Sequence, residues 1–96
     1  MRYITITTWE IDDGQNFDLA LRAIEEKRLP ALKGFGASRV TVIRTSDRTS
    51  AVITEWPDKF TRDAAELKID EVRRSAHRED QIRMTGELKG EIAADV

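Results

Sequence analysis

His77 is the only histidine in the chain and the first candidate for chemistry. Histidine is the residue type that most often gives and takes protons near neutral pH, so a well-placed one can act as a general acid or base. His77 is therefore the predicted catalytic residue. The alternative is a hydrated helix residue beside Arg78 that takes no part in chemistry.

Four further residues are predicted to bind a ligand. Trp9 and Trp56 offer flat apolar surfaces on which an aromatic ligand can stack. Thr7 and the neighbouring threonines could line a polar pocket together with Tyr3, where hydroxyls would orient a ligand oxygen or bound O₂. The alternatives are core or dimer packing for the tryptophans and simple strand propensity for the threonines.

The composition excludes several kinds of site. The chain has no cysteine, which rules out disulfides, Cys-ligated zinc, iron–sulfur clusters and thiol nucleophiles. With one histidine and no loop that has the spacing of a carboxylate site, we expect no metal and no cofactor. Sixteen basic and eighteen acidic residues nearly balance, so no basic surface for nucleic acid or for an anionic membrane is expected.

The N-terminal residues alternate in character from the start and contain no apolar run of the kind that a signal peptide or a membrane span requires. The lack of cysteine mildly favours a reducing compartment. We therefore expect a cytoplasmic protein, and a length of 96 residues predicts one domain, 1–96.

The elements that must position these residues begin with a strand at 3–11. Every residue in it except Glu10 is β-branched or aromatic, which favours a strand. Alternation places Ile4 and Ile6 on one face, and on the other Tyr3, Thr5, Thr7, Trp9 and Ile11. Both faces have the character of buried surface.

Helical spacing of apolar residues follows from Phe17 to Leu32, with Asn16 or Asp13 as the cap. Pro30 should kink this helix or end its regular part, and the glycines at 34 and 36 should stop it. Strands are predicted at 38–45 and 50–56, a second helix at 58–80 and a last strand at 87–96. On the second helix, the pairs Arg62–Glu66 and Asp70–Arg74 have the i,i+4 spacing of surface ion pairs.

The order is β-α-β-β-α-β, which predicts the ferredoxin-like α+β fold with a four-stranded antiparallel sheet. Both helices should cover one face of that sheet and leave the other bare. We assign Tyr3 and Trp9 to the bare face, and they are too large to leave in water. A second copy of the sheet would cover them, so the chain is expected to be a homodimer.

At this point the chain resembles the dimeric α/β-barrel superfamily, specifically its antibiotic-biosynthesis-monooxygenase-like group. The resemblance covers nearly the whole chain. It is carried by the strand at 3–11, by the Leu-Pro-Ala-Leu-Lys-Gly-Phe segment at 29–35, by Val-Ile-Thr-Glu-Trp at 52–56 with its polar turn and helix, and by Gly-Glu-Leu at 86–88.

The resemblance implies two sheets that close a dimeric α/β barrel, with a ligand cavity in each subunit between sheet and helices. The superfamily contains cofactor-independent oxygenases that act on aromatic polyketides, haem-degrading enzymes and many members without an assigned activity. The haem-degrading members use a helix histidine, a first-strand asparagine and a helix tryptophan. Thr7 and Ala65 stand at the last two of these positions, which argues against haem degradation.

Two functions remain open. The first is a small dimeric binding protein whose cavity takes a small, aromatic ligand. The second is a cofactor-independent monooxygenase-like enzyme that holds an aromatic substrate anion away from water while O₂ reacts with it, with His77 or a threonine hydroxyl assisting proton transfer. A shared fold cannot decide between them.

Overall fold

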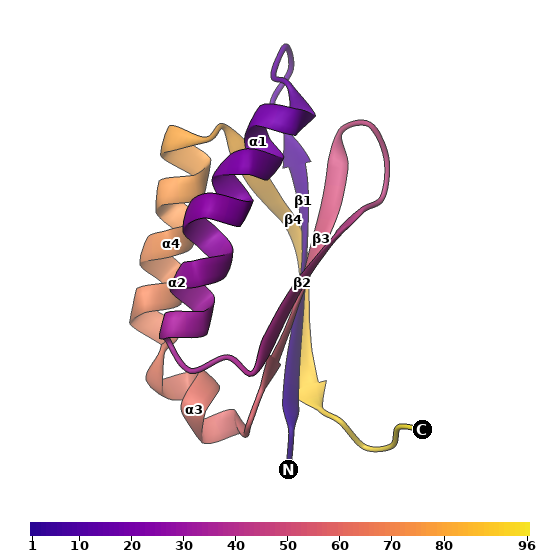
Figure 1. Cartoon of the computed structure of the whole chain (residues 1–96), viewed down its shortest axis with the longest axis vertical. Coiled ribbons are helices and arrows are strands. Elements are labelled where there is room, and N and C mark those ends of the chain that lie inside the picture. Colours follow the sequence, from indigo (N-terminus) through magenta and orange to yellow (C-terminus); the bar gives the residue numbers. More distant parts are fainter.

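The computed structural model describes all 96 residues. One antiparallel sheet of four strands carries its helices on a single face (Figure 1). The elements in chain order are β1 (Tyr3–Ile11), α1 (Phe17–Ala23), η1 (Ile24–Arg28), α2 (Leu29–Gly34), β2 (Arg39–Arg44), β3 (Thr49–Trp56), α3 (Lys59–Ala64), α4 (Glu66–Glu79) and β4 (Ile82–Glu91). The predicted βαββαβ order and the α+β fold are confirmed.

The first helical segment is continuous through α1, η1 and α2, and Asn16 provides its cap. The Asn16 side chain accepts hydrogen bonds from the backbone N–H groups of Asp18 at 2.8 Å and Leu19 at 3.4 Å. η1 is a π-helical turn, wider by one residue than an α turn, and it comes directly before the turn that contains Pro30. The expected interruption at Pro30 is thus a local widening, and the helix continues to Gly34.

The second helical segment is divided at Ala65, between α3 and α4. Asp58 caps α3: its carboxylate accepts from the Thr61 backbone N–H and from the Thr61 hydroxyl, both at 2.7 Å. These two hydrogen bonds favour the charged form and hold the pKa of Asp58 below its ordinary value. The predicted apolar stripe is present, because Ala65, Ile69 and Ala76 are buried.

The last strand lies earlier in the chain than predicted, at 82–91 rather than 87–96. β4 pairs with the whole of β1, from Ile82 opposite Ile11 to Glu91 opposite Tyr3, so the length of β1 fixes where β4 begins and ends. The alternation of apolar residues beyond Glu91 suggested strand, but no partner residues of β1 remain there for those residues to pair with.

The assignment of the two faces of β1 was wrong. Tyr3, Thr5, Thr7, Trp9 and Ile11 are buried, and they form the face that the helices cover. Ile4 and Ile6 point to the bare face instead. Alternation separates two faces of a strand, but it does not say which one the helices will cover.

The order of the strands is β2-β3-β1-β4, and β1 and β3 are therefore the two central strands. In their register Tyr3 is opposite Trp56, Thr5 opposite Thr54 and Thr7 opposite Val52. Since the side chains of opposite residues share a face, the helix-covered side of the two central strands combines aromatic groups with a row of threonines.

The core beneath the helices is divided into two clusters. One contains Trp9 with Ile11, Phe17, Ala20, Ile24, Ala76 and Ile82. The other contains Trp56 with Tyr3, Ala37, Ala65 and Ile69. Thr5, Thr7 and Thr54 of the central strands are on the same face of the sheet and belong to neither cluster.

Candidate functional site

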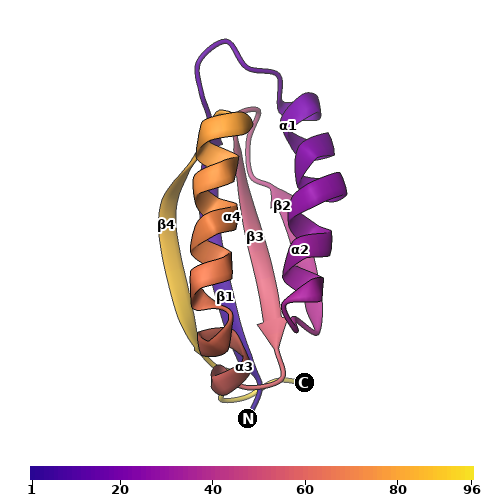
Figure 2. The same cartoon turned by 90° about the vertical axis from the view of Figure 1, so that its left-hand side faces the viewer.

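A cavity of about 60 Å³ lies between the sheet and the helices. Figure 2 shows the two helical segments on either side of β3, and the cavity opens between them. Its floor is formed by the side chains of β1 and β3, and its walls by residues of η1, α2, α3 and α4 and by the first residue of β4. The lining residues are Thr5, Thr7, Trp9, Ile24, Arg28, Leu29, Leu32, Val52, Thr54, Trp56, Arg62, Ile69, Val72, Arg73, Ala76 and Ile82.

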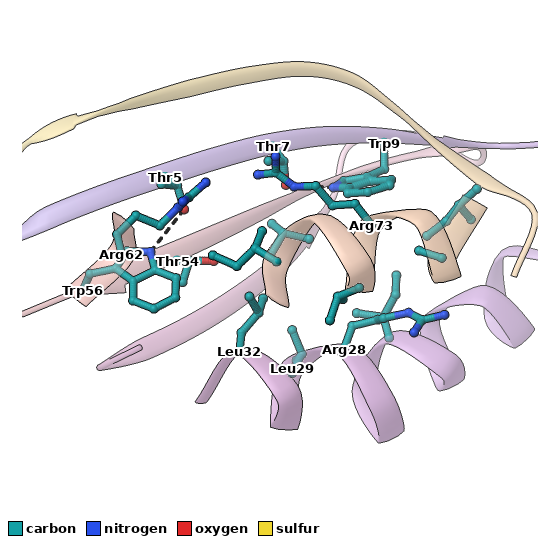
Figure 3. Close-up of a pocket in the computed structure, with 16 residues that line it drawn as sticks. Thr5, Thr7, Trp9, Arg28, Leu29, Leu32, Thr54, Trp56, Arg62 and Arg73 are labelled. Atoms are coloured by element: carbon teal, nitrogen blue, oxygen red, sulfur yellow. Dashed lines mark hydrogen bonds between the residues drawn. The ribbon is translucent and has the colours of Figure 1, made fainter. Parts of the chain in front are cut away.

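Each tryptophan is tied to a threonine of β1 (Figure 3). The indole N–H of Trp9 donates to the Thr7 hydroxyl at 2.7 Å, and the indole N–H of Trp56 donates to the Thr5 hydroxyl at 3.4 Å. A threonine hydroxyl that accepts one hydrogen bond still has its own proton to donate. Both hydroxyls line the cavity, so they can donate to an oxygen of a bound molecule.

Arg62 is a charged side chain inside this cavity. It comes from α3 and is only 1% exposed. Its Nη1 group forms an ion pair with Glu66, four residues later, and the pairing holds the pKa of the Glu66 carboxyl below its usual range. Nε and Nη2 of Arg62 have no hydrogen-bond partner. The predicted Arg62–Glu66 pair is therefore present, but its cation is buried and not at the surface.

Two more arginines line the cavity, and each is paired with a carboxylate. Arg28 in η1 forms an ion pair with Asp80 and donates to the Ser75 hydroxyl at 3.2 Å, so it links η1 to the end of α4. Arg73 in α4 pairs with Glu87 of β4 at 2.5 Å. These pairs hold the helices to each other and to the sheet edge around the cavity.

Three of the five predicted site residues line the cavity: Trp9, Trp56 and Thr7. Tyr3 does not line it and packs in the cluster that contains Trp56. His77 also lies outside, exposed on α4, in a shallow hollow that shares Trp9 and Arg73 with the cavity.

Arginines surround His77, and two of them are paired with carboxylates: Arg73 with Glu87 and Arg83 with Glu10. The Nδ1 of His77 lies 3.3 Å from the carbonyl oxygen of Ile82, and its hollow is also lined by Arg73, Arg74, Arg78 and Arg83. The position agrees with the edge of the apolar stripe, because the neighbouring residue Ala76 is buried. His77 is thus next to the cavity wall but does not face the cavity.

Arg62 is the cavity residue that the sequence interpretation missed. The pattern did contain a signal, since Arg62 precedes Ala65 by three residues and Ile69 by seven, which places it on the buried face of the helix. Its i,i+4 partner Glu66 suggested a surface pair instead.

The side chains of the structure form no group of three or more His, Asp or Glu residues that could hold a metal ion. No helix is long and apolar enough to cross a membrane.

No protein-family model and no curated protein matches the chain. Solved structures do match it over nearly its whole length. A variant of SnoaB, a cofactor-independent oxygenase from Streptomyces nogalater, is 10% identical, with a TM-score of 0.76 over 99% of this chain and 96% of that one. A protein of unknown function from Nitrosomonas europaea is 18% identical, with a TM-score of 0.74 over 99% and 92%.

A third match is a dimeric ferredoxin-like protein from an uncultured marine organism. It is 12% identical, with a TM-score of 0.72 over 100% of this chain and 98% of that one. At these identities the matches show the fold. The chain has the ferredoxin-like fold of these proteins, and the predicted resemblance is confirmed at the level of the fold.

Proposed function

We propose that the chain forms a homodimeric α/β barrel and that each subunit binds a small aromatic ligand in the cavity between its sheet and helices. The dimer is supported by the bare face of the sheet. Five large aliphatic residues point to that face: Ile4, Ile6, Ile43, Ile53 and Leu88. Leu88 is 71% exposed and Ile43 is 44% exposed in the single chain, so a second sheet would remove apolar surface from water.

The observation that carries the ligand proposal is that Trp9 and Trp56 line the same cavity from its two ends (Figure 3). Each indole belongs to a different core cluster, and its N–H is held by a threonine. The two ring systems are therefore fixed before a ligand arrives, which lowers the entropy that binding costs. Flat apolar walls with a few hydroxyl groups are typical of sites for small aromatic molecules.

The size of the cavity limits the ligand. About 60 Å³ is less than the roughly 150 Å³ of an engineered cavity that binds benzene. An aromatic ring therefore enters only if the helices on the two sides of the cavity move apart. Arg28 spans that opening through its contacts with Ser75 and Asp80, so these contacts must lengthen or break when the ring enters.

Tryptophan fluorescence tests this proposal with 1-naphthol as the probe. We expect saturable quenching in the unchanged protein, and a weaker response in Trp9→Phe and in Trp56→Phe, because each variant lacks one of the two lining indoles. Quenching that rises linearly with probe concentration in all three proteins would show that the indoles meet the probe only by collision. That result would refute a cavity site.

The second candidate is a cofactor-independent oxygenase, which the structural match to SnoaB favours. The cavity would hold an aromatic substrate away from water, and O₂ would be the oxidant. A cavity threonine would assist proton transfer, or His77 would do so from the adjoining hollow, which shares Trp9 and Arg73 with the cavity. Oxygen uptake with a dihydroxynaphthalene distinguishes the two candidates. An enzyme raises the rate above that of the uncatalysed oxidation, whereas a binding protein leaves it unchanged or slows it.

A further inference from the structure

The unpaired edge of Arg62 points to a specific ligand group. Of the three guanidinium nitrogens, Nη1 is used by Glu66, and the two without a partner are Nε and Nη2. Nε and Nη2 lie on the same edge of the planar group. That edge presents two parallel N–H donors, an arrangement that donates to both oxygens of a carboxylate.

Because Arg62 is buried, its two unpaired donors destabilise the folded protein. The side chain is 1% exposed, so bulk water does not hydrate the two donors. A buried charge with unsatisfied donors is destabilising unless another group completes its hydrogen bonds. Its partner Glu66 does not do this, because Glu66 bonds the opposite side of the guanidinium and its own side chain is 42% exposed.

The other cavity arginines are satisfied to a greater extent. Asp80 pairs with Arg28 and is only 9% exposed, and Glu87 pairs with Arg73. Arg28 has one nitrogen without a partner, Nε, whereas Arg62 has two on one edge. Most of the N–H donors that remain available to a cavity ligand are therefore on Arg62.

The surroundings of Arg62 also suit an anion. Figure 3 shows its guanidinium extending toward Thr5, at the end of the cavity where Trp56 lies. The Thr5 hydroxyl accepts from Trp56 and still has a proton to donate. We propose that the ligand of this cavity carries a carboxylate, which binds to Nε and Nη2 of Arg62 while its apolar part lies along the cavity toward Trp9. This rests on the proposed function in placing the ligand in the same cavity.

The inference is tested with three probes: benzoate, its neutral analogue benzamide, and acetate, which has no ring. ¹⁵N-labelled protein gives two indole N–H signals, one for each tryptophan. We expect benzoate to shift the Trp56 signal saturably and more than the Trp9 signal, because Trp56 lies at the Arg62 end. Benzamide should bind about 10- to 100-fold more weakly, since it has no negative charge and only one acceptor oxygen for the two donors.

Variants locate the binding group. Arg62→Met should weaken benzoate binding about 10- to 100-fold, and Arg62→Lys, which keeps the charge but not the two-donor edge, should be intermediate. The matched control Arg78→Met, an exposed arginine on α4, should bind benzoate like the unchanged protein. Glu66→Gln removes the carboxylate that offsets the charge of Arg62 from its Nη1 side and leaves Arg62 in place, so it should bind benzoate several-fold more tightly. If Arg62→Met does not fold, Glu66→Gln still tests the inference, because unchanged or weaker benzoate binding in Glu66→Gln would contradict a carboxylate site at Arg62.

The possible results separate the inference from the proposed function. Equal binding of benzoate and benzamide, unchanged by Arg62→Met, overturns the carboxylate site but leaves an aromatic cavity. Equal binding of benzoate and acetate supports the carboxylate site and refutes the preference for a ring. If neither benzoate nor acetate shifts an indole signal, the carboxylate site is refuted.

Discussion

Thr7 and Trp9 lie two residues apart on the same face of β1, and the indole N–H of Trp9 donates to the Thr7 hydroxyl at 2.7 Å. Trp56, from the adjacent strand, uses Thr5 in the same way. A buried indole needs such an acceptor. The threonines of β1 therefore orient the two rings that close the ends of the cavity.

The first prediction concerns this pair. Thr7→Val removes the acceptor and leaves the Trp9 N–H buried without a partner, which should lower the free energy of unfolding by about 1–3 kcal/mol. Urea denaturation measures this change. In a Trp9→Phe background, which has no N–H to satisfy, Thr7→Val should cost much less. Equal costs in both backgrounds would show that the hydrogen bond does not contribute.

The second prediction concerns the dimer. Light scattering at micromolar concentration should give twice the chain mass of 11.0 kDa. The interface between the two sheets should bury roughly 1,600 Å² or more, as in other specific complexes. Leu88 is on the edge strand β4 and is opposite Ile6 of the central strand β1. Leu88→Lys therefore places a charge on the bare face next to Ile6 and should give monomers.

Leu67→Lys is the matched control for the dimer. Leu67 is 82% exposed on α4, on the helix side of the molecule, and its replacement should leave the dimer intact. A monomeric unchanged protein, or monomers from Leu67→Lys but not from Leu88→Lys, would contradict sheet-to-sheet association.

The third prediction concerns stability in acid. The pKa of Asp58 is lowered in the folded protein, first by the Thr61 backbone N–H and then by the Thr61 hydroxyl. A carboxyl with a lowered folded pKa stabilises the fold above its unfolded pKa of about 4, and this contribution is lost as the pH falls through the folded value. The free energy of unfolding should therefore decrease as the pH is lowered below about 4.

Asp58→Asn tests this assignment, because an amide still accepts the capping hydrogen bonds but does not titrate. The difference between the free energies of unfolding at neutral and acid pH should be smaller in Asp58→Asn than in the unchanged protein. Some acid dependence should remain, since the pKa values of Asp63 and Glu66 are also lowered, by Lys59 and Arg62 respectively. An unaltered pH dependence would remove Asp58 from the explanation.

The fourth prediction concerns His77, whose catalytic role stays a proposal. His77→Ala should change stability by less than about 1 kcal/mol, because the side chain is exposed and makes one contact with a backbone carbonyl. If the protein is an oxygenase and His77 transfers the proton, the same change should slow oxygen uptake roughly 10²-fold. An unchanged rate would leave a threonine hydroxyl of the cavity as the candidate.

The sequence by itself determined the order of the elements and most of their ends. β-branched and aromatic residues specified β1, Asn16 and Asp58 specified where the helices begin, and the spacing of Ala65, Ile69 and Ala76 specified the buried face of α4. These features depend on residues within one or two turns of each other. Local chemistry is therefore enough to predict them.

The tertiary structure decided which side of β1 the helices cover, where β4 pairs, and how deeply Arg62 is buried. Each of these depends on segments far apart in the chain. The faces of β1 look alike in sequence, and only the register with β3 and the docking of the helices places Tyr3 and Trp9 inside. Arg62 and Glu66 would have the same spacing in an exposed pair. The packing of α3 against the sheet instead removes the arginine from water, at the lining of the cavity, and leaves two of its nitrogens without a partner.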